Sequence, residues 1–303
     1  MPDPICGPSE VLVELRAAGL NRRDLLVAGG TYPFPLPLIP GSDGAGVRRD
    51  TGEEVVVYPL AGWGPDEGAP LAGSQFLGGP LPGTYAELIA VPEDLLFPRP
   101  AGWSWQETAT LSVAGITAFR ALFTRGGLRA GETVLVLGAG SGVTAFAVQQ
   151  AAAAGARVLV TSSSDEKIER ARGLGAAGGV NYATTPDWPA AVREMGPVHL
   201  VLDSVGSTWQ QSLECLAPAG RLVVFGGTGG TEVTLQVRPV YFGQHTIMGI
   251  LLGSPRDFAA LLRDVAKADW RPVIDSTYAL ADAEAALAHL RGDHFGKIVL
   301  TCG

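Results

Sequence analysis

The stretch that decides the fold of this chain is Thr133-Val134-Leu135-Val136-Leu137-Gly138-Ala139-Gly140-Ser141-Gly142-Val143. Its first half is an apolar, β-branched run typical of a buried strand, and its second half is a glycine-rich turn. An alanine-rich helical stretch follows as far as Ala154, Gly155 is its stop signal, and a second apolar run covers 157–160. Strand, glycine turn, helix and strand make a βαβ unit, whose helix N-terminus offers backbone N–H groups to a pyrophosphate. The sequence therefore predicts a dinucleotide-binding unit, with a glycine turn in some other α/β domain as the alternative.

The end of the second strand indicates which nicotinamide cofactor binds. An NAD site places a carboxylate there, about 20 residues after the glycines, to accept hydrogen bonds from the ribose 2′-hydroxyl. In this chain Ser162 holds that position, Ser163 follows, and Lys167 lies on the opening turn of the next helix. Hydroxyls and an ammonium favour a 2′-phosphate, which a carboxylate would repel. The pattern predicts NADP(H); the alternative is that Ser164 and Lys167 only cap and decorate the helix.

Composition sets the class of protein. A chain of 303 residues, 47% hydrophobic and 17% charged, is long enough for two globular domains. Its formal net charge of −8, with no cluster of basic residues, argues against nucleic acid as a partner. The sequence shows neither a signal peptide nor an apolar run long enough to span a membrane, so we expect a cytoplasmic protein. Cys6, Cys215 and Cys302 are too far apart in sequence to form a metal or redox motif.

The pattern of short strands changes along the chain. In residues 1–108, strand-like runs at 11–15, 54–58 and 85–91 alternate with loops rich in glycine and proline, which predicts a small β module. Residues 109–248 turn helical and then repeat βα units, with further strands at 198–203, 220–225 and 246–249. Alternating strands and helices predict an α/β domain with a doubly wound parallel sheet. In residues 249–303, helical patterns at 257–268 and 281–291 precede a strand at 297–301 that we expect to return to the β module.

Collinear motifs give the chain a family resemblance that covers nearly its whole length. It resembles the medium-chain dehydrogenase/reductase superfamily, in particular its zinc-free, quinone-oxidoreductase-like branch. The resemblance implies a GroES-like β-barrel catalytic domain, built from both ends of the chain, around a Rossmann NADP-binding domain. The matching stretches are Ala17–Asp24, Pro40–Gly46, Gly83–Glu87, Val113–Ala118, Gly138–Val143, Thr161–Lys167, Asp203–Gly206, Phe225–Gly227 and Gly296–Leu300.

Three departures from the family pattern qualify that resemblance. Zinc-dependent relatives carry a cysteine where this chain has Asn21, and a His-Glu pair where it has Ser42-Asp43, so we expect no metal site. Thr144 stands where the family usually has a third glycine, and its Cβ is expected to shift the helix slightly. Relatives also have a strand or two before the segment that matches Pro2–Pro4, which raises the expectation of an incomplete barrel or a different natural start.

The resemblance also implies the site residues. Asn21 would line the cleft beside the nicotinamide and the substrate, unless it only holds a turn. Tyr32 matches a tyrosine that some enoyl reductases use as a proton donor, unless its ring only packs against the wall. Asp24 is expected to order the local backbone as an acid at a helix N-terminus. Strand and helix ends of the open sheet, together with the family motifs, predict these cofactor contacts: Thr117, Gly138, Gly140, Ser141, Gly142, Val143, Ser162, Ser163, Lys167, Tyr182, Ser204, Val205, Gly226 and Gly227.

The predicted function is zinc-independent hydride transfer from NADPH to a quinone or a related electrophilic carbonyl compound. The alternatives are an enone or enoyl-thioester reductase and, in another class, a non-enzymatic NADPH-binding protein. The apolar run 246–249 predicts an edge strand that needs cover, which together with the habit of related reductases indicates a homodimer. The sequence does not identify the small-molecule acceptor.

Overall fold

The computed structural model describes residues 2–303, and its chain forms two compact units. Unit 1 contains the chain up to Ile116 together with Ser254–Gly303, and unit 2 contains Thr117–Gly253. The two ends of the chain therefore belong to one unit, as the resemblance implies.

Unit 2 is built on a six-stranded sheet in which every strand pair is parallel. The strand order is β10-β9-β8-β11-β12-β13, with β8 and β11 adjacent at the centre, so that the sheet is wound in both directions from β8. Central strands read as continuous apolar runs because helices cover both faces of a parallel sheet. The strands are β8 (Thr133–Val136), β9 (Arg157–Ser162), β10 (Gly178–Asn181), β11 (Val198–Asp203), β12 (Leu216–Val224) and β13 (Thr246–Gly249).

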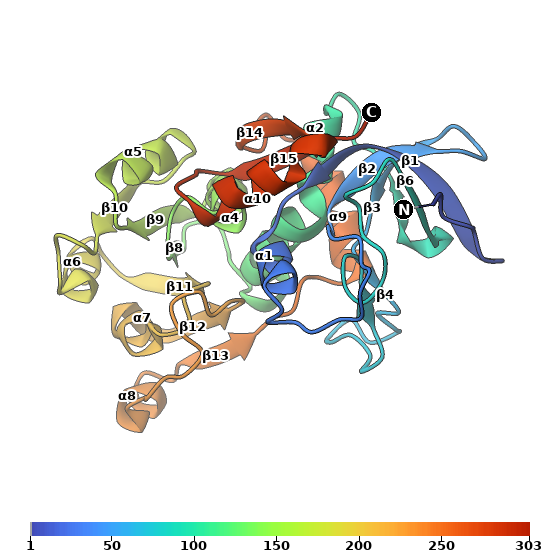
Figure 1. Cartoon of the computed structure of the whole chain (residues 1–303). Helices are drawn as coiled ribbons and strands as arrows, with labels where there is room; N and C mark the ends of the chain where they lie inside the picture. The colour runs from blue at the N-terminus through green and yellow to red at the C-terminus, as the bar shows by residue number, and fades with distance from the viewer. Residues whose placement is uncertain (1) are drawn as a thin grey trace. The chain divides into compact units, whose positions relative to one another are not determined.

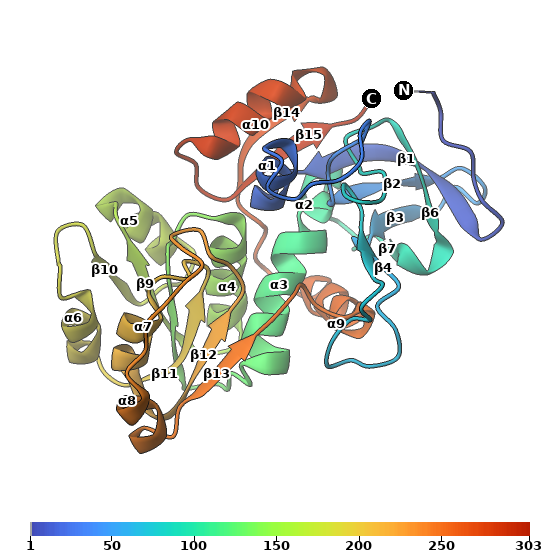
Figure 2. The ribbon, with the colours of Figure 1, turned by 60° about the horizontal axis from the view of Figure 1, so that its bottom comes forward.

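Helices join the strands of unit 2 and cover both faces of its sheet. In Figure 2, α4 and α7 lie on opposite sides of the sheet, where α4 packs on β8 and β9 and α7 packs on β11 and β12. The helices are α3 (Ile116–Phe119), which begins at the unit boundary, α4 (Gly142–Ala153), α5 (Asp165–Gly173), α6 (Trp188–Glu194), α7 (Trp209–Cys215) and α8 (Val237–Phe242). This arrangement confirms the predicted doubly wound parallel sheet.

Unit 1 is built on a seven-stranded sheet that both chain ends form together (Figure 1). Its path is β14-β15-β1-β2-β3-β7, and β6 also pairs with β1. The last strand lies antiparallel to the first, with Ala18 opposite Leu300, which confirms that the C-terminal segment returns to the β module. The strands are β1 (Glu10–Gly19), β2 (Gly44–Arg48), β3 (Glu54–Val57), β6 (Leu88–Pro92), β7 (Leu96–Pro98), β14 (Ile274–Ala279) and β15 (Lys297–Thr301), with a separate pair β4 (Leu60–Ala61) and β5 (Gln75–Phe76).

Four α-helices accompany this sheet. Three rings, Tyr58, Phe97 and Phe258, anchor α9 to the sheet, with ring centroids 5.1 to 6.2 Å apart. Such aromatic contacts add about 0.5–1.5 kcal/mol per pair to the burial of their area. The helices are α1 (Arg22–Ala28), α2 (Trp105–Ala109), α9 (Pro255–Val265) and α10 (Ala283–Arg291). No helix within residues 2–303 combines the length and the apolar character that crossing a membrane requires.

Six strands within residues 2–303 were not expected from the sequence, namely β2, β4, β5, β7, β10 and β14. β10 begins with Gly178-Gly179, β2 begins with glycine in a segment that reads as a loop, and β14 carries the polar run Asp275-Ser276-Thr277. β12 also begins earlier than predicted, because it continues through Ala219, which has a positive φ of 61°. By contrast, β11, β13 and β15 have the bounds that their apolar runs predict.

Candidate functional site

The predicted cofactor residues of unit 2 gather at one edge of its sheet. They lie at or shortly after the carboxyl ends of β8, β9, β10, β11 and β12, which are neighbouring parallel strands. Open α/β sheets bind their ligands at this edge, beside the strand at which the order reverses. Thr117 is the exception, because it lies buried in α3.

The glycine turn is tied to the end of β9. Gly138 has φ 72° and Gly140 has φ 129°, a backbone conformation that residues with a Cβ rarely adopt. The Gly138 N–H donates to Thr161 Oγ1 at 3.3 Å, and the Ala139 N–H donates to the Thr161 carbonyl oxygen at 2.7 Å. These two hydrogen bonds tie the glycine turn to Thr161, near the end of β9.

The first turn of α4 combines a cap with an unusual threonine. Ser141 is the N-cap, and its Oγ accepts the Thr144 N–H at 3.2 Å. The buried Thr144 hydroxyl lies 3.2 Å from the Gly138 carbonyl oxygen and 3.0 Å from that of Ser141, both of which can accept its proton. Thr144 thus links the helix to the glycine turn at the position where the family usually has glycine.

The residues predicted to select the 2′-phosphate differ in exposure. Ser162 is buried, and its Oγ accepts the Ser164 N–H at 3.2 Å, whereas Ser163 is exposed. Ser164 is the N-cap of α5, and its Oγ accepts the Lys167 N–H at 3.3 Å. The Tyr182 N–H donates to the Ser162 carbonyl oxygen at 3.0 Å, while 45% of the Tyr182 residue surface is exposed. The ends of β9 and β10 therefore bring these residues together.

A buried carboxylate shapes the loop after β11. Asp203 accepts hydrogen bonds at 2.7–3.2 Å from the N–H groups of Val205 and Gly206 and from the hydroxyls of Thr208 and Ser212. The loop after β12 then attaches to it, because the Thr228 N–H donates to the Ser204 carbonyl oxygen. Two of the predicted cofactor segments therefore form one fixed structure.

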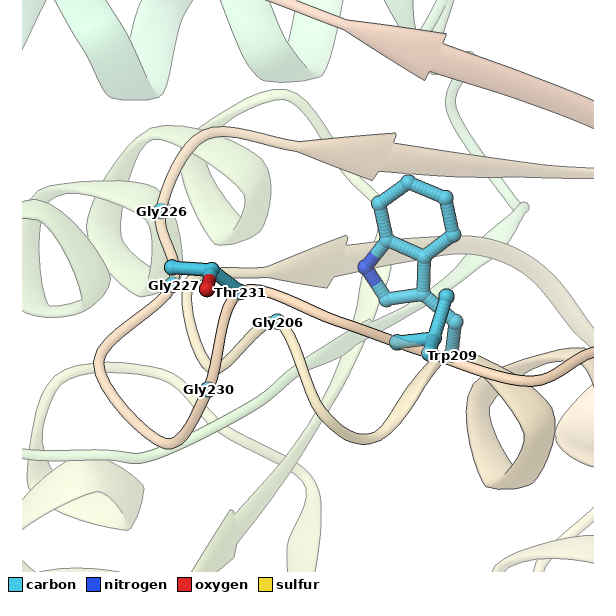
Figure 3. A pocket seen from close by; sticks show the side chains of 7 residues that line it. Gly206, Trp209, Gly226, Gly227, Gly230 and Thr231 are labelled. Carbon is cyan, nitrogen blue, oxygen red and sulfur yellow. The ribbon is translucent and has the colours of Figure 1, made fainter.

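A small pocket lies between these two loops (Figure 3). Its volume of about 290 Å³ suits one ring system rather than a whole dinucleotide. The nitrogen edge of the Trp209 ring faces the loop that carries Gly226 to Thr231, and Trp209 Nε1 is buried without a hydrogen-bond partner among the described residues. The pocket is lined by Gly206, Trp209, Gly226, Gly227, Gly230, Thr231 and Val233.

In unit 1, Asn21 lies buried at the start of α1, with 8% of its surface exposed. Asp24 Oδ2 accepts the Asn21 N–H at 2.7 Å, as in a capping box, which confirms the expected role of this acid at a helix N-terminus. The Tyr85 hydroxyl donates to the same oxygen at 2.7 Å. Burial raises the pKa of Tyr85 well above its usual value, so its proton remains available for this bond.

Lys297 is the first residue of β15, and the ammonium group of its buried side chain contacts Asn21. Its Nζ donates to the Leu20 carbonyl oxygen at 2.5 Å, to Asn21 Oδ1 at 2.7 Å and to Asp43 Oδ2 at 2.8 Å. These three acceptors use all three protons of the ammonium. The side chain of Lys297 is 3% exposed and that of Asp43 is completely buried, so the ion pair is shielded from water.

The two carboxyl groups near Lys297 have altered acidities. Burial raises the pKa of Asp24 to about 6, although the hydrogen bonds from Tyr85 and Asn21 oppose this shift. Burial also raises the pKa of Asp43, against the attraction of the Lys297 ammonium. One buried cation therefore faces two buried acids, and the acid without a direct contact to it is the easier to protonate.

Tyr32 lies on the loop after α1, where 44% of its surface is exposed. Its N–H donates to the Leu26 carbonyl oxygen at 3.3 Å, which fixes the backbone and leaves the phenol at the surface of unit 1. Arg23, in α1, holds this helix against the segment that carries Phe76 and Gly79. Its guanidinium stacks over Phe76 at 4.6 Å and donates to the Gly79 carbonyl oxygen. The buried Asn21 amide and the exposed Tyr32 phenol belong to adjoining segments and make no hydrogen bond to each other in the described part of the chain.

Sequence reasoning did not identify Lys297, or the contacts of Asp43 and Tyr85, as parts of this cluster. A signal exists for Lys297, because a single lysine opens an otherwise apolar strand, Ile298-Val299-Leu300, where a charge needs a buried partner. Which carboxylate meets it could not be read from the sequence, since Asp43 lies 254 positions away.

Comparisons with known proteins agree with this architecture. Residues 7–101 match the alcohol dehydrogenase GroES-like domain, and residues 142–267 match the zinc-binding dehydrogenase family. A zinc-type alcohol dehydrogenase-like protein of Schizosaccharomyces pombe is 36% identical, over 97% of this chain and 91% of its own. A quinone oxidoreductase of Pseudomonas aeruginosa is 35% identical, over 93% of this chain and 87% of its own. The crystal structure of an NAD-dependent alcohol dehydrogenase, 35% identical, covers 100% of this chain and 94% of its own, with a TM-score of 0.94.

These names raise the question of zinc, which the residues present do not fit. Asn21 Oδ1 and Asp43 Oδ2 both accept from the Lys297 ammonium, and the Ser42 hydroxyl donates to the Leu77 carbonyl oxygen at 2.7 Å. Within residues 2–303, no three His, Cys, Asp or Glu side chains are grouped so that they could hold a metal ion. Zinc sites need three or four such ligands, and here a cation already occupies the oxygens.

The raised pKa of Asp24 makes the stability of the protein depend on pH. The native state holds this proton up to about pH 6, whereas an unfolded aspartate loses it near 3.8, so native stability falls as pH rises between these values. Asp24→Asn keeps an oxygen for the two donors and removes the titration. The free energy of unfolding of the variant, relative to that of the original protein, should rise by about 2–3 kcal/mol between pH 4 and pH 8, as measured by urea unfolding.

Asp50→Asn is the matched control. Asp50 is exposed, and its hydrogen bond to Arg48 lowers the pKa of its carboxyl group, so any change with pH should have the opposite sign. A free-energy difference between Asp24→Asn and the original protein that stays constant from pH 4 to pH 8 would show that Asp24 does not titrate in this range.

Proposed function

The chain belongs to the medium-chain dehydrogenase/reductase superfamily, and we propose that it is a zinc-independent oxidoreductase that transfers a hydride from NADPH to a quinone or a related electrophilic carbonyl compound. Relatives in this superfamily are oxidoreductases, which supports an enzyme. The observation that carries the proposal is the set of cofactor residues at the carboxyl edge of the unit 2 sheet, together with a neutral Asn21 on unit 1 held by Lys297.

When bound, NADPH supplies the hydride. The residues of the chain would bind and orient the cofactor and polarise the carbonyl group of the acceptor. The N-terminus of α4 and the glycine turn would hold the pyrophosphate, because their N–H groups and the helix dipole favour anions. The pocket beside Trp209 is large enough for one ring of the cofactor. On unit 1, Asn21 and Tyr32 would donate hydrogen bonds to the acceptor oxygen, where negative charge develops.

The direct test is NADPH oxidation by the purified protein with quinones, enones and enoyl thioesters, each with and without a chelator. We expect turnover with at least one quinone, no loss on chelation and no stoichiometric zinc by elemental analysis. NADPH binding without oxidation by any acceptor would instead favour a non-enzymatic NADPH-binding protein. Chelator-sensitive turnover would contradict zinc independence.

Cofactor preference can be tested at Lys167. A charge-assisted hydrogen bond to the 2′-phosphate contributes about 1.5–3 kcal/mol. Lys167→Ala should therefore raise the dissociation constant for NADPH by about one to two orders of magnitude and leave that for NADH nearly unchanged, as followed by fluorescence titration. Arg172→Ala is the matched control, because it removes one exposed positive charge from the last turn of the same helix. Equal losses for both cofactors would exclude a 2′-phosphate contact.

Tyr32 distinguishes the proposed function from its main rival, the reduction of enones or enoyl thioesters. Its exposed phenol is the observation that favours this second candidate, because hydride addition to an enone leaves an enolate that must be protonated. If Tyr32 is the acid, Tyr32→Phe should lower kcat on enones roughly 100-fold or more and cost far less on quinones, whose reduced anion water can protonate. Unchanged rates on every substrate would leave Tyr32 as a wall residue.

We also propose that the protein is a homodimer that pairs along β13. This strand is at the edge of the unit 2 sheet, and the neighbouring apolar residues Val237, Tyr241, Phe242 and Leu251 are exposed. An uncovered edge beside exposed apolar side chains favours a second copy of the chain. Light scattering should report twice the mass of 31.4 kDa, and Val237→Ser with Phe242→Ser should shift the protein toward the monomer. A monomeric original protein at working concentration would contradict the proposal.

A further inference from the structure

The two ends of the Asn21 side-chain amide have different surroundings. One end lies 2.7 Å from Lys297 Nζ. The other end is buried and makes no hydrogen bond of good geometry to a described residue, although it lies close enough to the Asp43 carboxylate to lower the pKa of that group. A buried amide group without a good hydrogen-bond partner destabilises the folded protein, so its retention needs an explanation.

The chemistry of lysine fixes which end is which. An ammonium has three donors and no acceptor, so the Asn21 atom that it contacts must be the carbonyl oxygen Oδ1. The other end is then the NH₂ group, Nδ2, which has two donors. The neighbouring Asp43 carboxylate faces this end of the amide, and if it accepts one N–H the other has no acceptor among the described residues.

The backbone of Asn21 is held as firmly as its side chain. Its N–H donates to Asp24 Oδ2, and the preceding carbonyl, of Leu20, accepts from the same Lys297 ammonium. The protonated Tyr85 hydroxyl in turn fixes Asp24. Rotation of the amide would turn Nδ2 toward Lys297 and place two donors against each other, which the short Nζ contact does not permit.

We propose that Lys297 is a positioning residue, which locks the Asn21 amide so that Nδ2 donates to the oxygen of the carbonyl acceptor. This inference rests on the proposed function and identifies the group that performs its polarisation. Lys297 acts through Asn21 and does not touch the acceptor, because its own three donors are already used. The acceptor is thereby recognised as an uncharged carbonyl oxygen, which a neutral N–H serves best as negative charge develops on it.

The first test leaves Lys297 untouched. Asn21→Asp keeps an oxygen for Lys297 and replaces only Nδ2, while Asn21→Ala removes both ends. At pH 8, where a carboxyl group beside an ammonium is ionised, both variants should lose about 10- to 100-fold in kcat with a quinone that the original enzyme reduces. Their NADPH dissociation constants should stay within about twofold, since the predicted cofactor contacts lie on unit 2. An Asn21→Asp enzyme with full kcat would overturn the proposal.

The second test asks whether Lys297 acts through Asn21. Lys297→Met removes the donors, whereas Lys297→Gln keeps an N–H donor without the charge, so Gln should retain more of kcat than Met. In the Asn21→Ala background, Lys297→Met should lower kcat by less than about threefold further, because the amide that it positions is gone. Full additivity of the two losses would assign Lys297 a structural role alone and contradict the inference. Thermal unfolding of each variant checks that it folds.

A measurement without turnover separates this inference from the proposed function. In ¹⁵N-labelled protein, the side-chain Nδ2 resonance of Asn21 is assigned by its loss in Asn21→Ala. Adding 1,4-naphthoquinone together with NADP⁺, a pair that cannot react, should shift this resonance in the original protein and much less in Lys297→Met. A shift without NADPH oxidation would sink the proposed function and leave the positioning of Asn21 standing. Turnover without any shift of this resonance would support the proposed function and overturn the positioning of Asn21.

Discussion

The buried ammonium of Lys297 is the contact on which unit 1 depends. It joins the last strand of the chain to the segment after the first, and it binds Leu20, Asn21 and Asp43 at once. Such a pair is expensive to bury, and it stabilises only when every donor and acceptor is satisfied. Here all three protons of Nζ have acceptors, but Asp43 Oδ1 and Asp24 Oδ1 are buried without a hydrogen-bond partner among the described residues, and burial raises the pKa of Asp24 to about 6. The cluster therefore specifies one arrangement of both chain ends more than it adds free energy.

Unit 2 brings its predicted cofactor residues together mainly through the backbone of its sheet. A parallel sheet brings the carboxyl ends of its strands to one edge, so residues that are far apart in sequence become neighbours without any specific contact between their side chains. Thr161 holds the glycine turn, and Asp203 holds the loop after β11, so hydrogen bonds within the protein define the backbone of this edge. Preorganised N–H groups of this kind lose little entropy on binding an anion.

The sequence predicted the elements whose signals are local. The glycine turn, the cap at Ser164 and the strands with continuous apolar runs follow from short-range patterns. β10 and β14 were not predicted, because Gly178-Gly179 and Asp275-Ser276-Thr277 have low strand propensity. Pairing with a neighbouring strand makes these segments extended. The family resemblance indicated Asn21, but not how its amide is oriented. That orientation is set by Lys297, a partner 276 positions away that no local pattern could supply.

By the family resemblance, Asn21 and Ser42-Asp43 stand where zinc-dependent relatives carry a cysteine and a His-Glu pair, and this difference changes what the Lys297 cluster can do for an acceptor. A metal ion with an open position can coordinate a substrate oxygen directly. The Lys297 ammonium cannot, because its three donors are already engaged with protein oxygens. Its charge reaches the acceptor only through the Asn21 amide that it orients, and a neutral N–H is a far weaker electrophile than zinc. Such a site suits acceptors that take a hydride readily, and it is poorly suited to an unactivated ketone or to the oxidation of an alcohol, which needs the alkoxide stabilised. Under the proposed function, quinones and conjugated carbonyl compounds would therefore be better substrates than simple alcohols, and the similar proteins include both a zinc-type alcohol dehydrogenase-like protein and a quinone oxidoreductase.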